Sequence, residues 1–111
     1  MIILLSPNLS DERFSRLAQT WNDEVFVRVE LSGTFSEEEL ARLAAQAIAL
    51  KPDDFADVVL ELIAACPEAT PEVLRKIMRH GDDGAREAVC QRADLDGELR
   101  VLCGLAQMQP A

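Results

Sequence analysis

Hydrophobic residues in the middle of the chain recur with the period of an α-helix. Two successive runs follow the i, i+3, i+4, i+7, i+8 pattern, which places apolar side chains on one helical face. The residues are Leu40, Leu43, Ala44, Ala47 and Ile48 in the first run, and Phe55, Val58, Val59, Leu62 and Ile63 in the second. Pro52 lies between the runs and separates them. The pattern therefore predicts two helices within residues 36–66.

A helix-start signal occurs three times with the same spacing, opened by Ser10, Ser36 and Thr70. In each segment a Glu follows two positions later, a large apolar residue four later, a base six later and an aliphatic residue seven later. The hydroxyl side chain can cap orphan backbone N–H groups, and an acid in the first turn suits the helix dipole. Leu40 and Leu74 occupy matching positions, so both are predicted to be buried.

These repeated starts indicate a chain built from similar units. A degenerate fourth copy begins near Leu95, with Leu99 and Leu102 in register with Leu74 and Ile77. We therefore predict one all-α domain over residues 1–111, a short α-solenoid of helix pairs. The units are expected at about 10–32, 36–66, 70–92 and 95–109.

Residues 25–31 fit this scheme less well than the rest. From Val27 onward they alternate apolar and polar side chains, and they are rich in strand formers. The repeat places them as the second helix of the first unit, with Asp23 and Glu24 as its acidic start. We predict a helix here, and a short terminal β-hairpin with residues 1–5 is the competing interpretation.

Parts of the chain resemble the repeat of the leucine-rich repeat variant (LRV) family. The segments that carry the resemblance are 66–75 and 6–10, each with a proline three residues before the hydroxyl residue, and 22–28 and 82–89, each with an acidic turn. Unit two departs from the family pattern, because Gly33 replaces the proline and no Arg falls in the matching place. The resemblance implies a curved, HEAT/LRV-like stack of short helices and no activity. No cysteine precedes Cys66, so the iron–sulfur segment of some relatives is not implied.

Charge narrows the class of partner. The chain has 20 Asp and Glu residues against 11 Lys and Arg residues, a formal net charge of −9. A field of this sign repels nucleic acids and anionic membranes and favours a basic protein. The alternative is that the acidity only keeps the protein soluble. The prediction is a basic protein partner, with no nucleic acid and no membrane.

The chain ends and the cysteines predict a cytoplasmic location. The apolar residues 1–5 are too short for a signal peptide and no basic residue precedes them. No stretch approaches the ~20 apolar residues that would cross a bilayer. The three cysteines, Cys66, Cys90 and Cys103, are an odd number without CxxC spacing. This argues against a disulfide framework and fits a reducing compartment.

Few residues suit catalysis or metal binding. His80 is the only histidine and precedes Gly81 at an expected helix end. It could act as a base with Asp82 or Asp83, but the sequence places no Ser or Cys nucleophile beside it. The cysteine spacing is unlike known zinc patterns. Trp21, the only tryptophan, is expected in the core rather than at an interface. The sequence predicts no enzyme, no cofactor and no metal site.

Acidic clusters mark most of the expected helix starts, where capping accounts for them. In a stacked solenoid, helices of one class begin along the same edge, so these acids would align into a ridge that suits a basic partner. The residues predicted to bind the partner are Glu38, Asp54, Asp57, Asp82, Asp83, Asp94 and Asp96.

The predicted function is that of a non-catalytic protein-binding module. Its most specific form is an immunity or antitoxin-like inhibitor that binds a basic bacterial toxin, favoured by small size, acidity and an extended surface without a catalytic centre. The alternatives are a small adaptor or scaffold subunit of a larger bacterial assembly, and an enzyme subunit or metal protein that uses His80 and the cysteines. The sequence is compatible with a monomer or a homodimer.

Overall fold

The computed structural model describes residues 1–107, with side chains for residues 1–104. These residues contain six helices and two short strands. The elements are β1 (Ile2–Leu5), α1 (Asp11–Asp23), β2 (Arg28–Leu31), α2 (Glu37–Ala49), α3 (Asp54–Ala64), α4 (Pro71–His80), α5 (Asp83–Cys90) and α6 (Gly97–Gln107). The fold is mostly helical, as predicted. The end of the unit expected at 95–109 lies outside the described residues.

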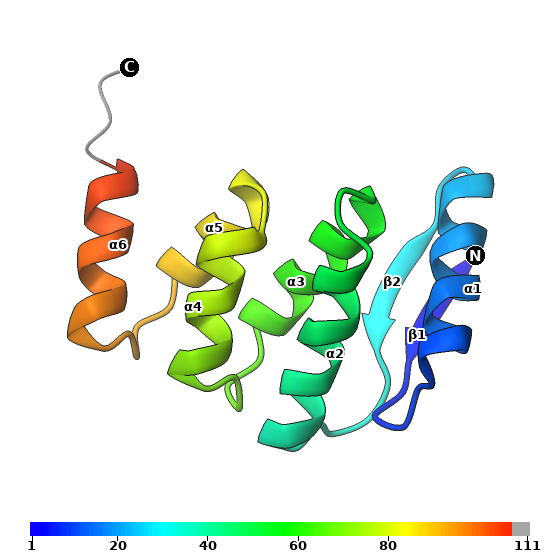
Figure 1. Ribbon diagram of the computed structural model, residues 1–111, viewed down its shortest axis with the longest axis horizontal. Helices are drawn as coiled ribbons and strands as arrows, with labels where there is room; N and C mark the ends of the chain where they lie inside the picture. The colour runs from blue at the N-terminus through cyan, green and yellow to red at the C-terminus, as the bar shows by residue number, and fades with distance from the viewer. Residues whose placement is uncertain (108–111) are drawn as a thin grey trace.

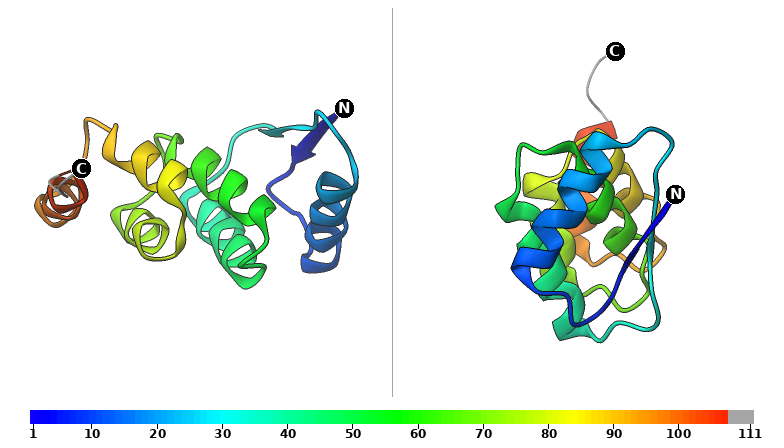
Figure 2. Two further views of the ribbon diagram at one scale, coloured as in Figure 1. Left: turned by 90° about the horizontal axis from the view of Figure 1, so that it is seen from above. Right: turned by 90° about the vertical axis from the view of Figure 1, so that its right-hand side faces the viewer.

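The helices stand in two rows. α1, α2, α4 and α6 lie side by side and run in the same direction, and α3 and α5 return behind them (Figures 1 and 2). α3 packs against α2 and α5, while α4 packs against α2, α5 and α6. β2 packs against α3, so the strands continue the row that α3 and α5 begin (Figure 2).

The predicted helix starts are confirmed. Ser10, Ser36 and Thr70 are the N-caps of α1, α2 and α4, and each hydroxyl accepts a hydrogen bond from the backbone N–H three residues on, at 3.2, 3.1 and 3.3 Å. The predicted core positions are also confirmed. Leu40 and Leu74 are 0% and 2% exposed, because the apolar residue four positions after the cap faces the neighbouring helices.

The prediction of a helix at residues 25–31 is wrong, because residues 28–31 form β2, and the mostly helical fold therefore includes a small two-stranded sheet. Asp23 ends α1 and the backbone of Glu24 caps it, so these acids close one helix instead of opening another. β2 pairs with β1 through Ile3 opposite Val29, and both side chains are buried. The alternation of apolar and polar residues therefore indicated a half-buried strand.

The competing interpretation is correct that residues 2–5 pair with this segment, but wrong that they form a hairpin, because the two strands are parallel. Parallel strands need a long crossover, and α1 supplies it. The backbone contacts extend beyond the strands: the N–H of Arg28 donates to the carbonyl of Met1 at 3.1 Å, and that of Ser32 to the carbonyl of Leu5 at 2.8 Å.

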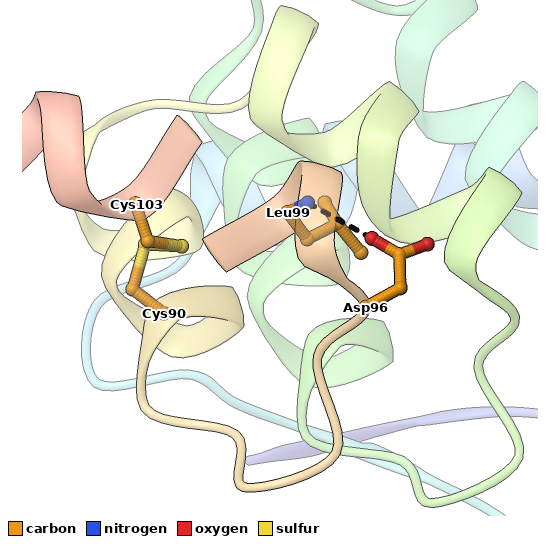
Figure 3. The surroundings of a disulfide bond; sticks show 4 residues. All are labelled: Cys90, Asp96, Leu99 and Cys103. Atoms are coloured by element: carbon orange, nitrogen blue, oxygen red, sulfur yellow. Dashed lines mark hydrogen bonds between the residues drawn. A yellow bond between two sulfur atoms is a disulfide. The ribbon is translucent and has the colours of Figure 1, made fainter. Parts of the chain in front are cut away.

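A disulfide bond joins Cys90 to Cys103, with Cα atoms 5.4 Å apart, and corrects the prediction that the cysteines form no disulfide (Figure 3). It links the end of α5 to α6, whose start is capped by Asp96 through a 2.9 Å hydrogen bond from the N–H of Leu99. Cys90 and Cys103 are 13 positions apart and meet because α6 packs against α5. Cys66 is the free cysteine. The cysteine argument for a reducing compartment is therefore lost.

Within residues 1–107, no helix combines the length and the apolar character needed to cross a membrane.

Candidate protein-binding surface

The direction of the helices places their acidic starts on two edges of the molecule. α1, α2, α4 and α6 begin on one side, here called the first edge, whereas α3 and α5 begin on the opposite side, the second edge (Figure 1). Short connections require this, because α3 starts five residues after the end of α2 and α5 three residues after the end of α4. The exposed acids of the first edge include Asp11, Glu12, Glu37, Glu38, Glu72, Asp94 and Glu98, and those of the second include Asp23, Glu24, Asp54, Asp82 and Asp83.

The predicted partner-binding residues do not form a single ridge. Glu38, Asp94 and Asp96 precede or begin helices of the first edge. Asp54, Asp82 and Asp83 lie at the second edge. The prediction combined helix starts from both edges. Because α3 and α5 run antiparallel to the other helices, these starts lie about one helix length apart.

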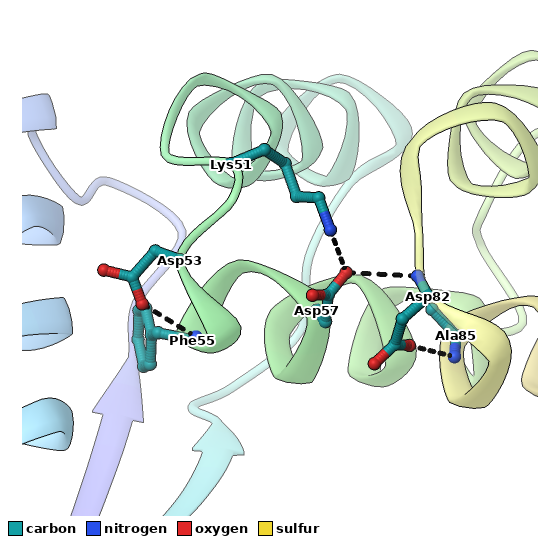
Figure 4. A network of polar contacts seen from close by, with 6 residues as sticks. All are labelled: Lys51, Asp53, Phe55, Asp57, Asp82 and Ala85. Carbon is teal, nitrogen blue, oxygen red and sulfur yellow. Dashed lines mark hydrogen bonds and ion pairs between the residues drawn. The ribbon is translucent and has the colours of Figure 1, made fainter.

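Asp57 is not available to a partner, which corrects its assignment as a binding residue. Its residue exposure is 8%, and its carboxylate forms an ion pair with Lys51 at 2.6 Å. The same oxygen accepts a hydrogen bond from the backbone N–H of Asp82 at 3.1 Å (Figure 4). The side chain of Asp82 in turn caps α5 by accepting from the N–H of Ala85 at 2.9 Å. These acids hold α3 and α5 together.

Asp94 and Asp96 are exposed or half-exposed but already have cationic partners. Asp94 accepts two hydrogen bonds from Arg92, at 2.9 and 2.7 Å, and these bonds lower the pKa of its carboxyl group. Asp96 forms an ion pair with Arg75 at 3.3 Å. Glu38, Asp54 and Asp83, by contrast, form no ion pair among the described side chains. They are the predicted residues best placed to attract an external cation.

Three arginines line a groove of about 410 Å³ between α4 and α6. Arg75 and Arg79 belong to α4 and Arg86 to α5, with Met78 and Leu102 providing apolar lining. Sequence reasoning found no basic patch, because Arg86 is separated from the other two along the chain and joins them only through the packing of α5 on α4. Glu98 also lines the groove and pairs with Arg75 at 3.5 Å, which leaves Arg79 and Arg86 without an ion pair among the described side chains. These two cations do not suit a basic partner.

The end of the molecule formed by β1 and the α1–β2 connection is apolar. Seven large hydrophobic residues are exposed among the described side chains, and five of them lie here: Met1, Ile2, Leu4, Val25 and Phe26. Phe26 is 94% exposed and has a φ of 60°. The sequence did not single out Phe26, because the segment was predicted to be a helix. In a helix Phe26 would have an ordinary backbone conformation and a packed side chain.

A shallow hollow of about 350 Å³ lies beside Phe26, lined also by Trp21, Asn22, Glu24 and Val27. Trp21 is half-buried and its ring centroid lies 6.0 Å from that of Phe55. It therefore packs against the core, as predicted, and also reaches this surface.

No catalytic arrangement emerges around His80 or the cysteines in the described part of the chain. His80 is the last residue of α4 and is exposed. Burial, and then the charge of Glu68, raise the pKa of the Cys66 thiol, which is opposite to the activation that a nucleophile needs. Among residues 1–104, no three His, Cys, Asp or Glu side chains come together as metal ligands.

Comparisons with known proteins found no matching family model, no matching curated protein and no matching solved structure. The surface described above is therefore the basis for a functional proposal.

Proposed function

We propose that this protein is a non-catalytic binding module that captures a basic protein through its acidic second edge. The observation that carries the proposal is the set of exposed carboxylates between α1 and α3. Asp23, Glu24 and Asp54 form no ion pair among the described side chains, and the nearby cation Lys51 is already paired with Asp57. Together with the net charge of −9, these groups supply an attractive field for a cationic surface.

The most specific form of the proposal is an immunity or antitoxin-like inhibitor of a basic bacterial toxin. A nuclease toxin binds phosphates, so its active cleft is basic, and a row of carboxylates competes directly for that cleft. Complementary charge mainly speeds capture, with association rates of ~10⁸ M⁻¹s⁻¹ or more at low salt. We further propose that the paired helices form a short LRV-type solenoid, whose edges offer an extended docking surface.

The proposal is tested by binding of the purified basic partner at increasing salt. We expect the affinity to fall by about tenfold or more between low and moderate ionic strength, mostly through slower association. Charge reversal at the second edge, Asp54→Lys with Asp83→Lys, should reproduce this loss at low salt. Each reversed first-turn charge should lower the free energy of unfolding by only ~0.3–1 kcal/mol, so the double variant should still fold.

Two matched variants identify the edge. Glu38→Lys with Glu72→Lys reverses two charges at the first edge, and Glu61→Lys with Glu87→Lys reverses two within α3 and α5. Loss of binding in the second-edge variant alone supports the proposal. Equal loss in all three variants, or binding that does not depend on salt, would show that the contact is apolar or lies elsewhere.

The adaptor alternative rests on a separate observation: apolar residues are exposed at both ends of the molecule. Ile2 and Leu4 lie on β1, and Val101 and Leu102 on α6. An adaptor would hold two partners at once, so a ternary complex in analytical ultracentrifugation would favour it over inhibition.

A further inference from the structure

Phe26 combines two unfavourable features at one residue. A φ of 60° is rarely adopted by bulky side chains, because Cβ crowds the carbonyl oxygen. The ring is also 94% exposed, so packing within the chain does not compensate for this backbone. Strain of this kind persists where surrounding structure imposes it, and it is frequent at sites that bind.

The hollow beside Phe26 has the composition of a cation site. Two aromatic residues, Trp21 and Phe26, line it together with the acidic residue Glu24. Aromatic faces attract cations through their quadrupole, and the carboxylate adds a full negative charge. No Lys or Arg lines this hollow.

A second hollow continues the acidic surface from the first. Asn22 lines both, and the second also contains Asp23 and Asp53. The amide of Asn22 donates to both oxygens of Asp53, at 3.3 and 3.1 Å, and so joins the end of α1 to the N-cap of α3. A chain with two neighbouring cationic side chains could therefore occupy both.

We propose that Trp21, Glu24 and Phe26 form a binding site for an arginine side chain of the basic partner. The guanidinium group stacks on the aromatic surfaces and bonds to the carboxylate of Glu24, and arginine suits this better than lysine because its planar group does both. This inference rests on the proposed function, since it names the contact by which the partner is anchored next to the second edge.

The probe is a nine-residue peptide of alternating glycine and arginine, titrated into the full chain at low salt. Trp21 is the only tryptophan, so its fluorescence reports the site directly. The same peptide with citrulline in place of arginine keeps the shape and removes the charge. We expect the arginine peptide to bind and the citrulline peptide to bind at least about tenfold more weakly.

Two variants test the residues. Phe26→Ala should weaken binding of the arginine peptide by about two- to thirtyfold, the range of a cation–π contact from exposed to desolvated. Glu24→Gln should weaken it by up to about fivefold, the range of an exposed ion pair. The matched controls are Val101→Ala, an exposed apolar residue on α6, and Glu61→Gln, an exposed acid on α3, and both should bind as the parent does. Circular dichroism confirms that each variant is folded.

Three results would overturn the site: no change in Trp21 fluorescence, equal binding of the citrulline peptide, or unchanged binding in Phe26→Ala. Failure of the proposed function looks different. If the basic partner is lost on charge reversal at the second edge but binds Phe26→Ala normally, the site is rejected and the function stands. If no salt-sensitive basic partner exists while the arginine peptide still needs Phe26, the function is rejected and the site stands.

Discussion

The carboxylate of Asp57 in α3 accepts a hydrogen bond from the backbone N–H of Asp82, the N-cap of α5, at 3.1 Å. The two residues are 25 positions apart, and the same carboxylate oxygen also binds Lys51 at 2.6 Å. One buried acid therefore fixes where α5 begins relative to α3 (Figure 4). The acid that sequence reasoning assigned to a partner is instead used inside the fold.

Replacing Asp57 should destabilise the protein. Asp57→Ala removes the acceptor of two charged hydrogen bonds and leaves the N–H of Asp82 unsatisfied, at a cost of about 1.5–3 kcal/mol in the free energy of unfolding. Chemical denaturation measures this change. Asp54→Ala, an exposed acid one turn earlier in the same helix, is the control and should cost less than about 1 kcal/mol. Equal costs would mean that the Asp57 network does not stabilise the fold.

Gly81 is required by a close approach between α4 and α5. Its φ is −77°, so conformational freedom is not the reason. A Cβ at this position would lie 2.8 Å from Cβ of Ala85 and 2.8 Å from the carbonyl oxygen of Ile77. Gly81→Ala should therefore cost about 1–3 kcal/mol of stability. Gly104→Ala meets nothing within 4 Å inside α6 and should stabilise by about 1 kcal/mol. The two thermal midpoints should move in opposite directions.

Phe26→Gly should separate stability from binding. Glycine adopts a φ of 60° without strain, and the lost ring was exposed, so the free energy of unfolding should rise by up to about 1 kcal/mol. Binding of the arginine peptide should fall. Val25→Gly is the matched control, since Val25 is also exposed but has no positive φ, and glycine there should lower stability slightly. A clear loss of stability in Phe26→Gly would contradict the strain argument.

The Cys90–Cys103 disulfide predicts a defined thiol count. In Cys66→Ala, no thiol should react under denaturing conditions before reduction, and two should react afterwards. Reduction should lower stability by about 2–4 kcal/mol, because the bond closes a loop in the unfolded chain. Arginine-peptide binding at the other end should be unchanged after reduction. Two reactive thiols without reductant would refute the pairing.

Cys66 should react slowly at neutral pH. Burial, and then Glu68, raise its pKa, so the thiolate appears only at higher pH than for a free thiol. The rate of alkylation by iodoacetamide, followed against pH, should therefore have its midpoint above the usual thiol range. Glu68→Gln removes the second cause and should shift the midpoint down. An unchanged midpoint would exclude Glu68 as a contributor.

The sequence by itself determined the helices and their starts. Ser10, Ser36 and Thr70 act as caps through contacts with N–H groups three residues away, so the signal is local. Leu40 and Leu74 follow from the helical period, which is also local. The net charge of −9, from which a basic partner is proposed, is likewise a property of the sequence alone. These features need no knowledge of which segments meet.

Only the tertiary structure decided the rest. Residues 28–31 became a strand because residues 2–5 were available to pair with them across α1, a contact that local propensity cannot weigh. The Cys90–Cys103 bond and the burial of Asp57 depend on how α6 meets α5 and α5 meets α3. The acidic starts divide between two edges because α3 and α5 run opposite to the other four helices. Each of these contacts joins residues distant along the chain, and the free energy that selects them arises from packing rather than from sequence neighbours.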